Sequence, residues 1–119
     1  MLPSYARLTS SSDFARTTKS GIRVTTDHFV GYLYLQPALT EAASAKAGLI
    51  ISKAVGGSVQ RHRLARKVRH ALIPVISTLP TNSLLVIRAL KQGEKFEAAE
   101  IELLVGKLKQ RAEKYAVTS

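Results

Sequence analysis

The residues best suited to chemistry form one dense cluster of cations in the middle of the chain. Five of the nine positions from 61 to 69 are basic, and a histidine lies within the cluster and another directly after it. The members are Arg61, His62, Arg63, Arg66, Lys67, Arg69 and His70. Guanidinium groups hold phosphates through two parallel hydrogen bonds and also stack on bases. The cluster therefore predicts a polyanionic partner, with nucleic acid as the first candidate.

The charge of the whole chain supports this prediction. The 119 residues carry a formal net charge of +10, and no acidic residue occurs between Glu41 and Glu94. Like charges three residues apart on a helix, such as Arg63 and Arg66, cost a few tenths of a kcal/mol (~0.2–0.5), which a polyanion would offset. A solvated basic face without a partner is the simpler alternative, but so many cations without an acid disfavour it. An acidic membrane surface would need aromatic anchors on the same helix, and none is seen.

Other kinds of chemistry find little support in the sequence. The chain has no cysteine, its three histidines are scattered, and its acids lie away from the cations. No nucleophile has an apparent base, so we predict no catalytic residue and no metal site in the protein. His62 and His70 are more simply explained as partly exposed helix histidines than as ligands. Gly56 and Gly57 precede the cationic helix, where they form either a simple turn or a phosphate-binding helix start.

A helix from Ser58 to about Ile76 positions the cations. Its apolar residues fall on one stripe, which predicts that this side packs on a core: Leu64, Val68, Ala71, Leu72 and Val75. The cations occupy the rest of the circumference. Ser58 is a good N-cap, and Pro74 marks the end where the helix loosens.

The remaining elements are predicted from caps, turns and hydrophobic periodicity. We expect a helix from Ser11 to a stop at Gly21, strands at 22–24, 29–35, 47–53 and 84–89, and a loop from Pro37 to Lys46. A terminal helix should bury Phe96, Ala99, Leu103, Leu104 and Leu108. The order is αβββαβα, an α+β sandwich in which helices pack on a mixed four-stranded sheet. Residues 1–119 form one domain, and residues 1–6 and 116–119 are expected to fray.

Residues 53 to 69, K-A-V-G-G-S-V-Q-R-H-R-L-A-R-K-V-R, resemble the signature of the bacterial ribonuclease P protein family. The family pattern is roughly K-x-V-G-x-A-V-x-R-N-R-x-K-R-x-x-R. His62 replaces an Asn of that pattern, Ala65 replaces a Lys that Lys67 could substitute for, and His70 replaces an acid. Weaker similarity extends to Leu8–Phe14, Gly21 and Phe29–Tyr32.

The resemblance implies a more specific fold. Members of this family have the same αβββαβα order in a two-layer, ribosomal-protein-S5-domain-2-like sandwich. They are also known for a left-handed βαβ crossover, which general rules of chain handedness make very rare.

The resemblance also implies a function. In the family a catalytic RNA with bound Mg²⁺ removes the 5′ leader of precursor tRNA, and the protein binds both the RNA and the leader. Carried over by position, the residues expected to contact RNA are Arg61, His62, Arg63, Arg66, Lys67, Arg69 and Lys53. Phe14, Phe29 and Tyr32, again with Lys53, are expected to line a cleft for the single-stranded leader, although Phe14 and Phe29 could equally be core residues. Thr18 stands where relatives often carry a second aromatic residue.

We therefore expect a cytoplasmic protein, a monomer or weak dimer when free, with no membrane partner and no activity without its RNA. The main alternative is another small RNA-binding or ribosomal protein. A DNA-groove reader is less favoured because the cations lack interspersed Asn, Gln or Ser, and a freestanding nuclease is favoured least.

Overall fold

The computed structural model describes residues 7–36, 44–90 and 96–118. Three helices and four strands alternate in the predicted order αβββαβα, with one short 3₁₀ turn. The elements are α1 (Ser11–Ser20), β1 (Ile22–Thr25), β2 (Phe29–Leu35), β3 (Lys46–Ile50), η2 (Lys53–Val55), α2 (Ser58–Ile76), β4 (Ser83–Ala89) and α3 (Ala98–Thr118). The predicted α+β class is confirmed.

The strands form one mixed sheet in the order β1-β2-β4-β3. β2 lies antiparallel to both β1 and β4, with Gly31 opposite Val24 on one side and Ile87 on the other. β3 runs parallel to β4, and Gly48 pairs with Val86. The predicted four-stranded mixed sheet is therefore confirmed.

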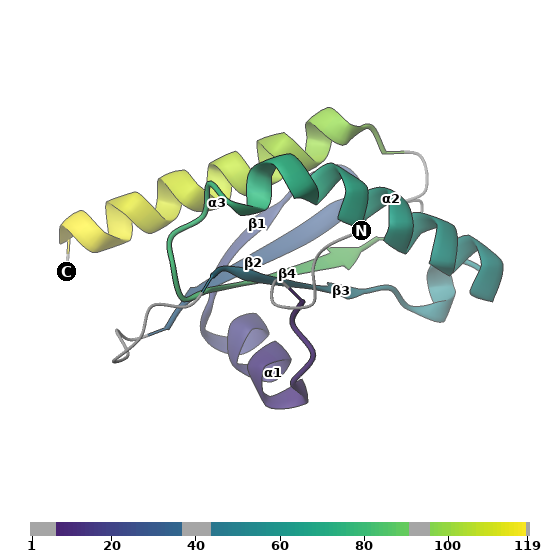
Figure 1. Cartoon of the computed structure of the whole chain (residues 1–119), viewed down its shortest axis with the longest axis horizontal. Coiled ribbons are helices and arrows are strands. Elements are labelled where there is room, and N and C mark those ends of the chain that lie inside the picture. Colours follow the sequence, from purple (N-terminus) through teal and green to yellow (C-terminus); the bar gives the residue numbers. More distant parts are fainter. Residues whose placement is uncertain (1–6, 37–43, 91–95, 119) are drawn as a thin grey trace.

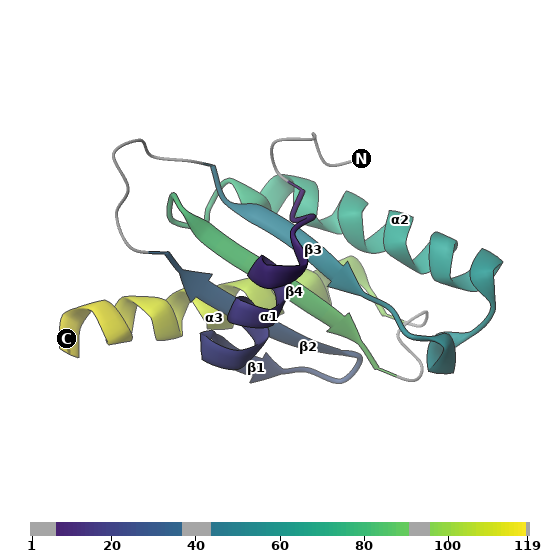
Figure 2. The same ribbon diagram turned by 90° about the horizontal axis from the view of Figure 1, so that it is seen from below.

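The connection from β3 through α2 to β4 is a left-handed crossover. In Figure 2, β3 and β4 point the same way, and β4 lies to the right of β3 when one looks along the strands. α2 lies on the far face of the sheet in that view, as Figure 1 confirms. A right-handed crossover would place β4 on the other side of β3.

Both faces of the sheet are covered by helices, to different extents. α2 and α3 lie on one face, and the shorter α1 lies on the other (Figure 1). The larger core cluster contains Phe29 and Leu33 beneath α2 and α3, and the smaller contains Val30 and Tyr32 on the α1 side. The predicted two layers are the sheet with α2 and α3, and α1 adds a partial third layer.

The buried face of α2 agrees with the prediction, whereas that of α3 differs in part. Leu64, Val68, Ala71 and Leu72 of α2 are buried, and Val75 packs against them. In α3, Leu104 and Leu108 are buried as expected, but Ala99 is exposed and Leu103 is 53% exposed. The buried stripe of α3 instead consists of Ile101, Leu104, Val105, Leu108 and Ala112. The helix begins at Ala98, and its rotation points this other stripe at the sheet.

Several boundaries also differ from the predictions. β3 ends at Ile50, and the chain then turns into η2, so Lys53 is not part of the strand. Gly57 rather than Ser58 is the N-cap of α2, and its N–H donates to Gln60 Oε1 at 2.7 Å. α3 continues to Thr118, and the fraying of its last residues stays a prediction. Residues 1–6 and 119, and residues 37–43 of the expected loop, lie outside the described residues.

Gly31 allows α3 to approach the sheet closely. A Cβ at this position would lie 2.9 Å from Cδ1 of both Leu104 and Leu108, which is too close for normal contact. The missing side chain is therefore part of how α3 packs on β2.

The turn between β1 and β2 is attached to α3 through one carboxylate. Glu100 Oε2 accepts hydrogen bonds from Thr26 Oγ1 at 2.6 Å and from the His28 backbone N–H at 2.8 Å. Glu100 Oε1 lies 2.6 Å from His28 Nδ1. Partial burial acts to raise the pKa of Glu100, but the hydrogen bonds from Thr26 and His28 outweigh it, so the pKa is lowered.

Replacing Gly31 by alanine should destabilise the fold by about 1–3 kcal/mol, because the added methyl group overpacks the contact with Leu104 and Leu108. Gly106→Ala is the matched control, since nothing lies within 4 Å of the added Cβ at that exposed position of α3. The control should gain about 0.5–1 kcal/mol from helix propensity. Urea unfolding measures both changes, and an unaffected Gly31→Ala protein would contradict the close packing.

Glu100→Gln should lower the free energy of unfolding at pH 7 by about 1–3 kcal/mol, because hydrogen bonds to a charged acceptor are lost. The folded pKa is lowered, so this contribution is complete above the ordinary value of 4.5 and is lost as the pH falls through the folded pKa. The difference between the two proteins should therefore shrink in acid. Exposed Glu97→Gln is the control and should change stability by less than about 0.5 kcal/mol. A pH-independent difference in urea unfolding would contradict this role for Glu100.

Candidate nucleic-acid interface

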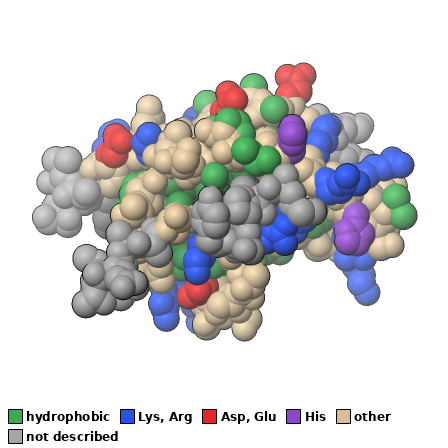
Figure 3. All heavy atoms as spheres, in the orientation of Figure 1, with side chains coloured by type: hydrophobic (Ala, Val, Ile, Leu, Met, Phe, Trp, Pro, Cys, Tyr) green, Lys and Arg blue, Asp and Glu red, His purple; other side chains and the backbone are tan. Residues whose placement is uncertain are grey.

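α2 directs its cations away from the core. Because Leu64, Val68 and Leu72 face the sheet, the side chains of Arg63, Arg66 and Lys67 are left exposed. Figure 3 shows Lys and Arg side chains gathered over the part of the molecule where the N-terminal half of α2 lies in Figure 1. His62 and His70 are exposed on the same helix. The sequence-predicted cluster is thus one continuous surface, which we call the α2 surface.

Two arginines of the cluster are less exposed to a binding partner than the other cations. Arg61 and Arg69 are half-buried. The Nε atom of Arg61 is buried and has no hydrogen-bond partner among the described residues. Of the predicted cations, Arg63, Arg66 and Lys67 are therefore the ones most open to a large partner.

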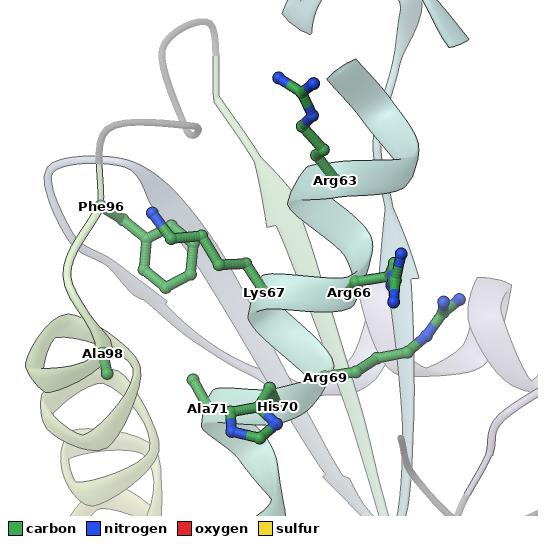
Figure 4. Close-up of a pocket in the computed structure, with 8 residues that line it drawn as sticks. All are labelled: Arg63, Arg66, Lys67, Arg69, His70, Ala71, Phe96 and Ala98. Atoms are coloured by element: carbon green, nitrogen blue, oxygen red, sulfur yellow. The ribbon is translucent and has the colours of Figure 1, made fainter. Parts of the chain in front are cut away.

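Beside the α2 surface lies a hollow of about 560 Å³ between α2 and the start of α3. Its lining residues are Arg63, Arg66, Lys67, Arg69, His70, Ala71, Phe96 and Ala98, and we call it the α2–α3 hollow. Lys67 reaches toward Phe96, with Nζ 5.1 Å from the ring centroid, in a cation–π contact (Figure 4). In the same view Arg66 and Arg69 extend to the other side of α2. The cations of α2 therefore spread in two directions around the helix.

The residues expected to hold the leader lie partly on the α1 side of the sheet. Phe14 is half-buried, and its ring occupies the space where a side chain of Gly48 would be. Tyr32 lies on the same face but is only 9% exposed, so it offers little ring surface. Lys53 is exposed in η2, just after β3. α1 crosses this face, and the carboxyl ends of β3 and β4 extend beyond it (Figure 2).

The placement of Phe29 in this cleft is wrong. Phe29 is fully buried and packs edge to face on Phe96, with ring centroids 4.9 Å apart. It belongs to the core beneath α2 and α3, whereas Tyr32 belongs to the core beneath α1. Side chains an odd number of positions apart on a strand point to opposite faces, so Phe29 and Tyr32 cannot line the same surface.

Sequence reasoning missed Arg88 on the α1 side of the sheet. Arg88 is exposed on β4 and pairs with Val30 on one side and Ile50 on the other. The alternation of side chains along β4 predicts this position, because Arg88 points to the same face of the sheet as Leu84 and Val86. Arg88 and Lys53 thus put two exposed cations near the uncovered end of this face. We call Phe14, Ile50, Lys53 and Arg88 the open-face surface.

Within the described ranges, no three His, Cys, Asp or Glu side chains come together as a metal site requires. No helix of those ranges is long and apolar enough to cross a bilayer.

An α+β sheet whose crossover helix carries an uncompensated cationic surface defines a small basic protein suited to a polyanionic partner. Comparison with known proteins makes the class specific. A family model described as Ribonuclease P matches residues 2–113. The chain belongs to the bacterial ribonuclease P protein family, and is therefore a subunit of that endoribonuclease. The alternative of another small RNA-binding or ribosomal protein finds no support in these comparisons.

Individual relatives agree with this assignment. A ribonuclease P protein component of Mycolicibacterium vanbaalenii is 38% identical over 102 residues, covering 86% of this chain and 85% of the relative. A ribonuclease P protein component of Acidothermus cellulolyticus is 35% identical over 114 residues, covering 92% of this chain and 93% of the relative.

Solved structures support the fold. The Staphylococcus aureus RNase P protein is similar with a TM-score of 0.70 and 21% identity, covering 90% of this chain and 94% of that one. The Thermotoga maritima RNase P protein is similar with a TM-score of 0.68 and 18% identity, covering 88% of this chain and 96% of that one.

Proposed function

We propose that the protein acts in ribonuclease P by binding two RNA segments on different surfaces, while the RNA subunit performs the cleavage. The α2 surface binds the catalytic RNA. The open-face surface holds the 5′ leader of precursor tRNA, whose removal gives the mature tRNA 5′ end. The observation that carries this proposal is the exposure of Arg63, Arg66 and Lys67 on a helix whose other side is buried in the core.

The α2 surface suits a folded RNA. Its cations are fixed on a rigid helix, so their spacing is set before binding, and contact with phosphates releases condensed counterions. Arg63 and Arg66 can each form two hydrogen bonds to one phosphate. Between Glu41 and Glu94 no acid is available to neutralise them.

The open-face surface suits a single strand of any sequence. Exposed cations follow a sugar–phosphate backbone, and an aromatic face stacks on bases without selecting them. Here Lys53 and Arg88 supply the charge, and half-buried Phe14 supplies the aromatic ring. Tyr32 is more buried than Phe14, which shifts the binding toward electrostatics. Phe14 and Arg88 lie on the face of the sheet opposite α2, so the two RNA segments do not occupy the same space.

Mg²⁺ belongs to the RNA in this proposal. The described residues hold no group of acids and histidines suited to a metal, whereas RNA phosphates are hard oxygen ligands of the kind Mg²⁺ prefers. The protein contributes binding, is inactive without the RNA, and works in the cytoplasm. We also propose that the free chain is a monomer or weak dimer.

Arg63→Glu together with Arg66→Glu should weaken binding to the catalytic RNA by at least about tenfold, because two phosphate contacts are lost. The slope of log K against log salt should fall by about 1.4–1.8, which is two contacts at about 0.7–0.9 each. Filter binding across a salt series measures both quantities.

The matched control reverses two exposed cations outside α2, with Lys19→Glu and Lys107→Glu. Both double variants have the same net charge, so only position distinguishes them. Circular dichroism checks that each is folded. Equal loss of affinity in both variants would show a general charge effect and would contradict a defined α2 surface.

A further inference from the structure

The α2–α3 hollow combines an apolar floor with a cationic rim. Ala71 of α2 and Phe96 are buried, and Ala98 is exposed at the start of α3. Two alanines facing each other across the hollow leave it open, since larger side chains would fill it. Its volume of about 560 Å³ is within the range of about 300–1,000 Å³ that is usual for small-molecule pockets.

The rim is entirely basic among the described lining residues. Lys67 and Arg63 lie on one wall, with His70 further along α2 (Figure 4). The other side of the start of α3 is different, because the hollow there is lined by Asp27, Glu97 and Glu100 as well as by His28 and Lys107. A phosphate would therefore be attracted to one side of α3 and repelled from the other.

We propose that the α2–α3 hollow binds one unstacked nucleotide of the partner RNA, an inference that rests on the proposed function of the α2 surface. The base lies against Ala71 and Ala98, and its phosphate is held by Lys67 and Arg63. The hollow shares Arg63, Arg66 and Lys67 with the α2 surface, so an RNA bound to that surface lies beside the hollow.

Both parts of a nucleotide are needed to explain the hollow. A phosphate alone gains nothing from an apolar floor, and exposed Arg63 and Arg66 already offer it a site. An apolar protein side chain would fit the floor but gains nothing from the basic rim. Lys67 Nζ, now 5.1 Å from the Phe96 ring centroid, can move to the phosphate, since both positions satisfy its charge. Phe96 is only 3% exposed, so it offers the base little ring surface.

The first experiment uses the wild-type protein and two probes. Adenosine 5′-monophosphate is titrated into ¹⁵N-labelled protein, with ribose 5-phosphate as the probe that lacks a base. We expect the adenosine nucleotide to shift the amide signals of Ala71 and Ala98, and ribose 5-phosphate to leave them nearly unchanged. Equal shifts from both probes, or no shift at these residues, would overturn the proposal.

The second experiment fills the hollow without changing charge. Ala98→Leu should weaken binding of the catalytic RNA by about fivefold or more, because the leucine side chain occupies the space proposed for the base. The salt slope should stay at the wild-type value because no cation is removed. Ala99→Leu is the control, since Ala99 is also exposed but lines the hollow on the other side of the start of α3. It should bind like the wild type.

These results separate the inference from the proposed function. If Ala98→Leu binds normally while the Arg63 and Arg66 reversal abolishes binding, the nucleotide site is wrong and the α2 surface stands. If the charge reversal has no effect, both are wrong. Thermal unfolding of Ala98→Leu shows whether the variant folds, and the titration of the wild-type protein decides the matter if it does not.

Discussion

From Leu84 to Ile87, β4 is buried on both faces, and the rest of the structure follows from that constraint. Leu84 and Val86 belong to the core on the α1 side, and Leu85 and Ile87 to the core beneath α2 and α3. Burying such a side chain stabilises the fold by about 1.5–3 kcal/mol, so helices must cover both faces. α2 and α3 cover one face fully, whereas the ten residues of α1 cover only part of the other. The outer side of α2 forms the α2 surface, and the part of the sheet that α1 leaves uncovered forms the open-face surface.

The distribution of charge follows the same division. α2 needs only one stripe for packing, which leaves the rest of its circumference free for cations. The acids near the start of α3 lie elsewhere, and Glu100 is used internally to hold the β1–β2 turn. The cations of α2 therefore keep their field instead of being neutralised by neighbours. Repulsion between these cations lowers the stability of the free protein, and binding of an RNA partner offsets this cost.

The sequence predicted local features well and three-dimensional neighbours less well. The stripe of Leu64, Val68, Ala71 and Leu72 is set by helical periodicity, so α2 and its surface could be predicted. Alternation along β2 and β4 puts Phe29 and Tyr32 on different faces of the sheet and Arg88 on the open face, so these placements could also be predicted. By contrast, Glu100 meets Thr26 and His28 only through tertiary packing.

Three further features lay outside local reasoning. The left-handed crossover runs against the general rule and came from the family resemblance alone. Which side of α3 faces the sheet depends on where the helix starts. Periodicity alone does not decide this, because Leu103 and Ile101 each fit an apolar stripe. The α2–α3 hollow depends on Ala71 and Ala98, which are far apart in the chain and meet only in the folded protein.

The central claim is that separate surfaces serve the catalytic RNA and the leader. It is tested most directly by substrate binding to the reconstituted holoenzyme carrying Lys53→Ala and Arg88→Ala. The account predicts normal assembly with the catalytic RNA, unchanged affinity for mature tRNA, and affinity for leader-bearing precursor tRNA reduced by about fivefold or more. Equal weakening of both substrates, or loss of assembly, would contradict it.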